Sequence, residues 1–207
     1  LALPAVYGAL TVFPIASMAK DHFGKGAGVL AAWLIAFMPA HVTHSTWALA
    51  DHDAFVMLFL SVGFMYWLRA VKYAGSSRIS KTTSPHPLSF VRAFKDVAAH
   101  RQTAMANAAL AGVAFGVVAL GWKGFVVGPS ILFLAYALQV ALNMFRRRDS
   151  TSLSVMFLVM LTTTFLMALP FYAHPQLNLV LDSTGLQPFL FIFGFTIAIA
   201  FVTTGFR

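Results

Sequence analysis

The sequence predicts an all-α, polytopic helical membrane protein, and three observations support this prediction. Hydrophobic residues make up 59% of the chain, charged residues only 10%, and the mean hydropathy is +0.80. Soluble domains carry about 25% charged residues, so this composition excludes an ordinary soluble domain. The apolar residues gather in runs long enough to cross a bilayer, and the cations fall between alternate runs.

Seven apolar runs are candidate transmembrane helices, because a helix needs roughly 20 residues to cross about 30 Å of hydrocarbon. Prolines inside some runs are compatible with this prediction, since neighbouring helices satisfy the backbone groups that a proline frees. The chain begins at Leu1 without a methionine, so we expect a single transmembrane domain, 1–207, that is a fragment of a longer protein. The runs are 1–18, 26–43, 54–71, 105–121, 125–145, 153–173 and 186–203.

The cations predict the orientation, because cytoplasmic loops hold the excess of Lys and Arg. With seven spans, all but one of the 14 Lys and Arg residues fall on one side, which is predicted to be cytoplasmic, and Lys123 is the exception. The loop with Asp51 and Asp53 is then expected on the extracytoplasmic face of the cell membrane. A basic inner face beside anionic lipid explains the net charge of +8, so nucleic-acid binding is not predicted.

Residues 73–104 form the one long polar segment and are predicted to be a cytoplasmic loop. Their first half is rich in Ser, Gly, Pro and Thr, which is typical of a flexible connection. In the second half, apolar residues recur at helical spacing from Phe90 to Ala98, while Arg92 and Lys95 fall mostly elsewhere on the helical wheel. The pattern predicts a short helix that lies either on the membrane surface or in solvent as a connector.

Two glycines in the span 105–121 predict close helix packing. Gly112 and Gly116 lie four residues apart, so they share one face of a helix. Small residues at this spacing allow a neighbouring helix to approach closely.

The densest group of chemically reactive side chains lies between the second and third spans. The chain has no Cys and no Glu, so its six side-chain carboxylates are all aspartates, and Asp51 and Asp53 are two of them. Carboxylates two residues apart can reach one hard divalent cation such as Mg²⁺ or Mn²⁺, and His52 could add an imidazole nitrogen. On spacing alone an alternative stays open, because Asp53 also suits the N-terminus of a helix through the helix dipole.

The residues around this loop resemble the catalytic subunit of oligosaccharyltransferase, and most of all its single-subunit archaeal form. The resemblance is strongest in residues 4–55 and 105–150. Within these ranges it is carried by Pro39 and by the segments 4–14, 20–25, 28–32, 51–55, 111–116 and 120–125.

The family's acidic motif, Arg-Ser-x-Ala-Gly-x-x-Asp-x-Asp/Glu, aligns with the loop. Asp51 and Asp53 match the acidic pair, and Ser45 matches the serine. Three positions depart from the motif, where the arginine, alanine and glycine are replaced by His44, Trp47 and Ala48.

The resemblance implies part of a GT-C type membrane domain, from an enzyme that transfers an oligosaccharide from a dolichol-type lipid phosphate or pyrophosphate to asparagine in an Asn-x-Ser/Thr acceptor. It implies that Asp51 and Asp53 are catalytic, that Asp51 is a ligand of Mg²⁺ or Mn²⁺, and that Asp53 is either a second ligand or a partner beside the ligands. His52 remains a third candidate ligand from its spacing alone. The implied partners are the lipid-linked oligosaccharide, the acceptor polypeptide and membrane lipids. The candidates for contact with substrate are His44, Trp47, Trp122 and Lys123.

The family takes further site residues from an earlier acidic loop, from a later glutamate and from a soluble C-terminal domain. This sequence has no glutamate, so we do not expect the chain alone to be competent. Three alternatives stay open: another GT-C glycosyltransferase acting on lipid-linked sugars, a non-catalytic membrane subunit, and a metal- or proton-coupled transporter that uses the acidic loop with His41 and His44.

Overall fold

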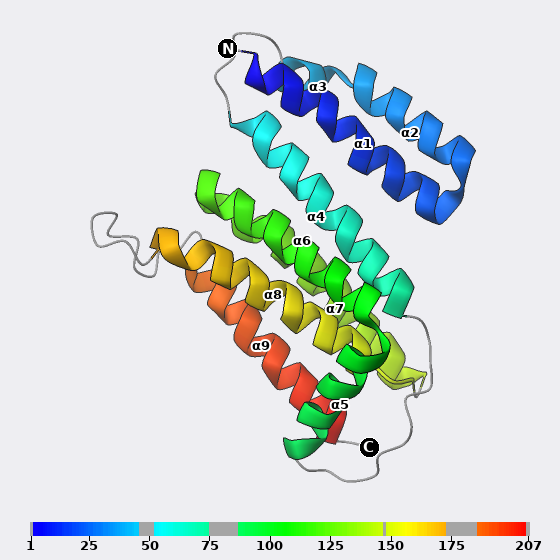
Figure 1. The fold of residues 1–207 in the computed structure, drawn as a ribbon, viewed down its shortest axis with the longest axis vertical. Helices are drawn as coiled ribbons and strands as arrows, with labels where there is room; N and C mark the ends of the chain where they lie inside the picture. The colour runs from blue at the N-terminus through cyan, green and yellow to red at the C-terminus, as the bar shows by residue number, and fades with distance from the viewer. Residues whose placement is uncertain (1, 46–51, 75–86, 147, 173–185, 206–207) are drawn as a thin grey trace.

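Every regular element in the described part of the chain is a helix (Figure 1), as the sequence predicts. The structure, a computed structural model, describes residues 2–45, 52–74, 87–146, 148–172 and 186–205. The elements are α1 (Leu3–Phe23), α2 (Lys25–Phe37), α3 (Pro39–His44), α4 (Asp53–Ala74), α5 (Pro87–His100), α6 (Gln102–Gly121), the 3₁₀ helix η1 (Lys123–Val126), α7 (Val127–Phe145), α8 (Thr151–Tyr172) and α9 (Leu186–Gly205).

Among the described residues, six helical segments are long and apolar enough to cross a membrane. They are α1, α4, α6, η1 together with α7, α8 and α9. The remaining predicted span, 26–43, is divided into α2 with 13 residues and α3 with 6. The predicted count of seven spans is therefore not confirmed.

The division falls at Met38, and proline explains it. Met38 has extended backbone angles, φ −65° and ψ 117°, and is followed by Pro39. The proline ring clashes with a helical conformation of the residue before it, and proline suits the first position of a helix. One helix therefore ends before Met38 and another begins at Pro39. Pro14 lies inside α1, which stays continuous.

Helices α2, α1, α4, α6, α8 and α9 lie side by side in this order (Figure 1). Helix α1 turns into α2 through Gly24, whose φ of 93° is in the left-handed region that favours glycine. Helices α1 and α4 run in the same direction, and α6 runs back between α4 and α8. The start of α4 therefore lies at the same end of the molecule as the end of α6.

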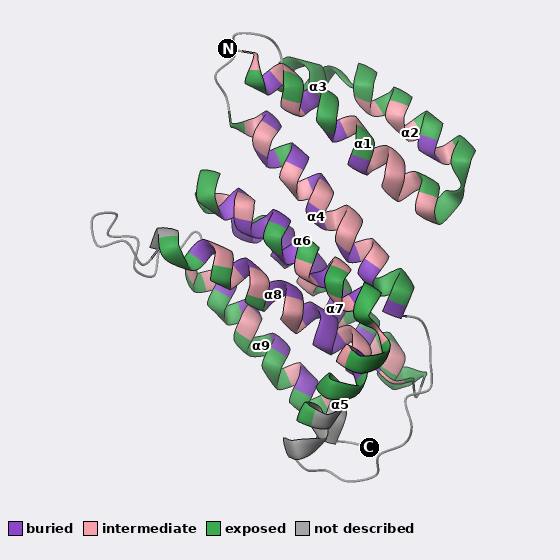
Figure 2. Cartoon of the chain, viewed as in Figure 1, coloured by how far each residue is buried: buried purple, intermediate pink, exposed green. Residues whose placement is uncertain are grey.

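The core lies around α6 and α8, where buried residues are most frequent (Figure 2). Phe115 of α6 fills the space between α4 and α7, because a Cβ on Gly63 or on Gly128 would lie 2.7 Å from its ring. In the same core the ring of Phe157 contacts Trp67 at a centroid distance of 5.3 Å and stacks on Tyr136 at 4.7 Å. The helices that carry the candidate site at their ends are thus held by aromatic packing.

Gly112 and Gly116 bring α6 close to α8, as their spacing predicts. A Cβ on Gly112 would contact the Met160 carbonyl and lie 2.7 Å from Thr163 Cβ, and one on Gly116 would contact Met167. The Thr164 hydroxyl donates a hydrogen bond of 3.1 Å to the Gly112 carbonyl across this interface. The same hydroxyl lies 2.9 Å from the Met160 carbonyl of its own helix, so its one proton is shared between α8 and α6.

Helix α5 occupies the second half of the predicted polar loop 73–104 and packs against α6, α8 and α9. Its Val97 is buried, whereas Val91 and Phe94 are exposed. The inward face of α5 thus serves as a packing face. The location of this helix at the membrane surface stays a prediction.

Candidate active site

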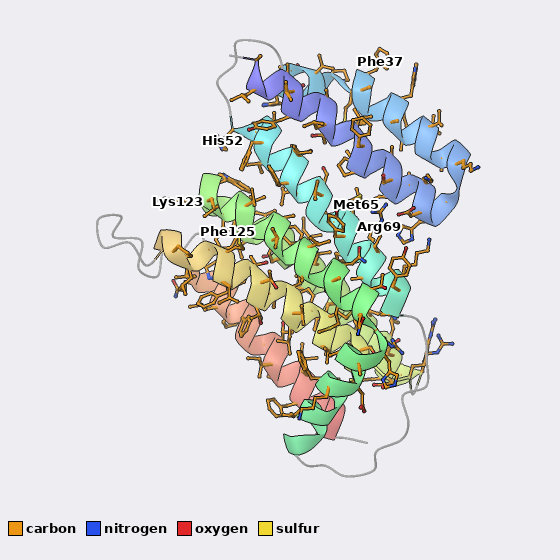
Figure 3. The ribbon with its side chains drawn as sticks, viewed as in Figure 1. Phe37, His52, Met65, Arg69, Lys123 and Phe125 are labelled. Carbon is orange, nitrogen blue, oxygen red and sulfur yellow. The ribbon has the colours of Figure 1, made fainter. Side chains whose placement is uncertain are left out.

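Four helix ends meet at one end of the bundle: the beginnings of α1 and α4 and the ends of α3 and α6. Figure 3 shows His52, just before α4, and Lys123, just after α6, at this same end. The sequence-predicted site residues that the structure describes all lie here.

Short polar contacts and one glycine fix α3 against α1. His41 Nε2 lies 3.1 Å from the Gly8 carbonyl oxygen and donates to it in the tautomer that carries this proton. The Ser45 hydroxyl donates a hydrogen bond of 2.7 Å to the carbonyl of His41. A Cβ on Gly8 would lie 2.7 Å from Ser45 Oγ, so only glycine lets Ser45 approach this closely.

The Asp53 carboxylate lies between two imidazoles in the first turn of α4. His44 Nδ1 is 3.0 Å from Asp53 Oδ2, and His52 Nε2 is 3.8 Å from Asp53 Oδ1. The side chains of His44, His52 and Asp53 are 57%, 53% and 41% exposed, so solvent and ligands can reach all three. Asp53 is the acidic residue in the first turn of α4, at the positive end of the helix dipole.

Phe55 connects the beginning of α4 to both of its neighbours. Its ring packs edge-on against Tyr7 of α1, with a centroid distance of 5.7 Å. On its other side a Cβ on Gly121 would lie 2.8 Å from Phe55 Cε1, so the end of α6 comes directly against the ring. Trp122 and Lys123 follow Gly121 and are thereby placed beside the first turn of α4.

Trp122 closes the turn between α6 and α7. Its backbone N–H donates a hydrogen bond of 2.8 Å to the Val118 carbonyl, and its indole lies over Gly124, where a Cβ would come within 2.6 Å of Cε2. Lys123 is exposed on η1. This turn presents a cation and an indole at the end that holds the Asp53 carboxylate.

The structure thus brings together His44, His52 and Asp53, with Trp122 and Lys123 at the same end. Two predicted site residues, Trp47 and Asp51, lie outside the described residues. Within the described ranges, no group of three His or Asp side chains is close enough to hold a metal ion.

Sequence reasoning did not single out the residues that position this group. Gly8 and Gly121 admit the side chains of Ser45 and Phe55, and Tyr7 supports the Phe55 ring. All three lie in apolar spans, where glycine and tyrosine also have ordinary packing roles. A sequence signal for them would require knowledge of which helices are neighbours.

The fold and the six apolar helices define an integral membrane protein. Residues 1–205 match the family model described as "Oligosaccharyl transferase STT3, N-terminal". The match covers almost the whole chain, and the chain therefore belongs to the STT3 family of oligosaccharyl transferases.

One curated relative is the "Dolichyl-phosphooligosaccharide-protein glycotransferase 3" of Archaeoglobus fulgidus. It is 28% identical to this chain over 190 residues, which cover 87% of the chain and 19% of the relative. The chain therefore spans about a fifth of the length of the curated relative that it matches. No solved structure matches the chain.

Proposed function

We propose that this chain is the part of an oligosaccharyltransferase catalytic subunit that carries one acidic motif of the active site. The reaction is the transfer of an oligosaccharide from a dolichol-type lipid phosphate or pyrophosphate to asparagine in an Asn-x-Ser/Thr acceptor. The family match supports the class of enzyme. The observation that carries the assignment of the site is the placement of Asp53 between His44 and His52 at the exposed start of α4.

The donor atoms at this end fit Mg²⁺ or Mn²⁺ in their chemistry. Carboxylate oxygens are the ligands that these cations prefer, and Mn²⁺ also accepts imidazole. We propose Asp51 and Asp53 as ligands and His52 as an additional one, with the remaining ligands coming from other parts of the complete enzyme. A bound divalent cation would stabilise the negative charge on the departing phosphate.

His44 positions the Asp53 carboxylate in this proposal. A hydrogen bond from Nδ1 to Oδ2 holds one oxygen of Asp53, and the other oxygen lies 3.8 Å from His52 Nε2. In the family's motif an arginine stands at this position, and a histidine keeps a hydrogen-bond donor there. This arrangement orients the carboxylate that holds and polarises the acceptor amide.

Lys123 and Trp122 contribute to substrate binding in the same proposal. The exposed ammonium of Lys123 offers a positive charge to the phosphate of the lipid-linked donor, at the end where the sugar must be transferred. The Trp122 indole suits the boundary between water and hydrocarbon, where the lipid carrier enters. We expect the whole group on the extracytoplasmic face of the cell membrane.

Substitution of the acidic pair in the complete enzyme tests this proposal. We expect Asp51→Ala and Asp53→Ala each to lower glycan transfer to a labelled Asn-x-Thr peptide by at least about 100-fold, because metal ligation and amide orientation are both lost. Transfer is measured by the mobility shift of the peptide, with lipid-linked oligosaccharide and Mn²⁺ in excess.

Asp96→Ala is the matched control, because Asp96 lies on the exposed surface of α5 and its removal also deletes one carboxylate. This variant should transfer at the rate of the unchanged enzyme. Transfer by Asp51→Ala at the unchanged rate would refute the catalytic assignment of the loop.

A further inference from the structure

A second group of charged side chains lies at the opposite ends of α1 and α4. Arg69 Nε donates a hydrogen bond of 2.7 Å to Asp21 Oδ2, and Figure 3 labels Arg69 near the end of α4. Lys72 Nζ donates a hydrogen bond of 2.7 Å to the backbone carbonyl of the same Asp21. Two cations from α4 therefore converge on one residue of α1.

These contacts leave most of the cationic donors available. The ion pair uses Nε of Arg69, so the terminal nitrogens Nη1 and Nη2 are not part of it. Lys72 bonds to a backbone carbonyl, which carries no formal charge, so its ammonium keeps its positive charge. The two contacts hold the Arg69 and Lys72 side chains in place. The group keeps a net positive charge, and several of its N–H donors take no part in these two contacts.

Two further lysines increase the positive charge at this end. Lys20 precedes Asp21 on α1, and Lys25 begins α2 directly after the turn at Gly24. A Cβ on Gly28 would lie 2.8 Å from Lys20 Cβ, so the base of the Lys20 side chain is held in the contact between α1 and α2.

The positions of these cations near the ends of apolar helices predict that the group lies at a membrane surface. Both α1 and α4 are long and apolar enough to span a membrane. Lys20 and Lys72 lie in the last turns of α1 and α4, and Arg69 lies three residues before Lys72. Phe23 and Tyr73, close to Asp21 and Lys72 in the chain, are exposed aromatic residues of the kind found where headgroups meet hydrocarbon. Val71 adds an exposed apolar side chain beside them.

We propose that Arg69 and Lys72, held by Asp21, form a binding site for the phosphate of an anionic phospholipid. The guanidinium fork can donate two parallel hydrogen bonds to phosphate oxygens, and the ammonium adds a point charge. The acyl chains would lie along the exposed apolar side chains of the same helix ends. A soluble phosphate could use the cations but would gain nothing from that apolar surface.

The test measures lipid binding by the purified full chain in detergent. Phosphatidylglycerol and, separately, phosphatidylcholine are titrated, and bound lipid is counted by native mass spectrometry. Arg69→Gln with Lys72→Gln should lower the preference for phosphatidylglycerol roughly 30-fold, and Lys72→Gln alone roughly 5-fold, since each cation near a membrane surface contributes about 1 kcal/mol. Because Lys72 is exposed, the single variant decides the question if the double variant fails to fold.

Arg146→Gln with Arg148→Gln is the matched control, since it removes two exposed cations after α7. This variant should keep the preference. An equal loss in both double variants would show that the attraction comes from total charge and would overturn the proposed site. Displacement of phosphatidylglycerol by an equal concentration of inorganic phosphate would instead identify a soluble anion as the ligand, and would also overturn it.

Discussion

At the scale of single residues, two glycines allow side chains of the candidate site to pack closely against neighbouring helices. Gly8 admits Ser45, which follows α3, and Gly121 admits the ring of Phe55. In both places an added methyl group would meet a side chain rather than open space. The position of the Asp53 carboxylate thus depends on residues that carry no reactive group themselves.

We expect Gly8→Ala to destabilise the contact between α1 and α3. Its Cβ would collide with Ser45, and overpacking of this kind costs about 1–3 kcal/mol. Thermal unfolding of the purified protein, followed by circular dichroism, should show a lower midpoint for this variant.

Gly194→Ala serves as the comparison for Gly8→Ala. Gly194 lies within α9, and a Cβ there would have nothing within 4 Å. This variant should unfold at the same or a higher temperature, because alanine favours helix over glycine by about 1 kcal/mol. Equal midpoints for the two variants would contradict the close packing of Gly8.

At the scale of the helices, two prolines near the site have different effects on helix continuity. Pro14 lies within a continuous α1, whereas Pro39 separates α2 from α3. The break matters for the site because α3 carries His41 and His44, whose side chains reach Gly8 and Asp53. A straight continuation of α2 would carry these histidines away from their present partners.

We expect Pro39→Ala to let α2 and α3 join into one helix. A helix rises about 1.5 Å per residue, so spin labels at positions 33 and 43 should move toward the separation of about 15 Å expected along a straight axis. Electron paramagnetic resonance measures this distance. Pro14→Ala should leave it unchanged, and an unchanged distance in both variants would show that proline does not cause the break.

At the scale of the whole molecule, the two ends of α4 carry different charged groups. The Arg69 and Lys72 group lies at one end of α4, and Asp53 lies at the other. This polarity agrees with the predicted orientation, in which the cation-rich ends of the helices face the cytoplasm. The chain contains no cysteine, so single cysteines can report on each side without a background.

We expect Lys123→Cys, but not Lys95→Cys, to react with a membrane-impermeant maleimide added to intact cells. Both residues are exposed, and they lie on η1 and on α5. Lysis should make Lys95→Cys reactive as well, which controls for its accessibility. The reverse pattern in intact cells would contradict the predicted orientation.

The sequence predicts the fold class, six of the spans in their approximate positions and the close contact at Gly112, because composition, run length and small-residue spacing are local properties. It also leads to His44, His52 and Asp53 through a contiguous motif. It does not predict which proline breaks a helix, since membrane helices tolerate proline in some surroundings and not in others. The contact between Asp21 and Arg69, 48 residues apart, depends on the neighbourhood of α1 and α4, which no local pattern records.

Helix α4 is one continuous helix that carries a charged group near each end. Sixteen residues separate Asp53 from Arg69, which is about 24 Å along a helix axis. A bilayer whose hydrophobic thickness differs from the length of a helix changes the tilt of that helix. If headgroups hold the Arg69 end, the thickness of the bilayer sets how far the Asp53 carboxylate stands above the opposite surface.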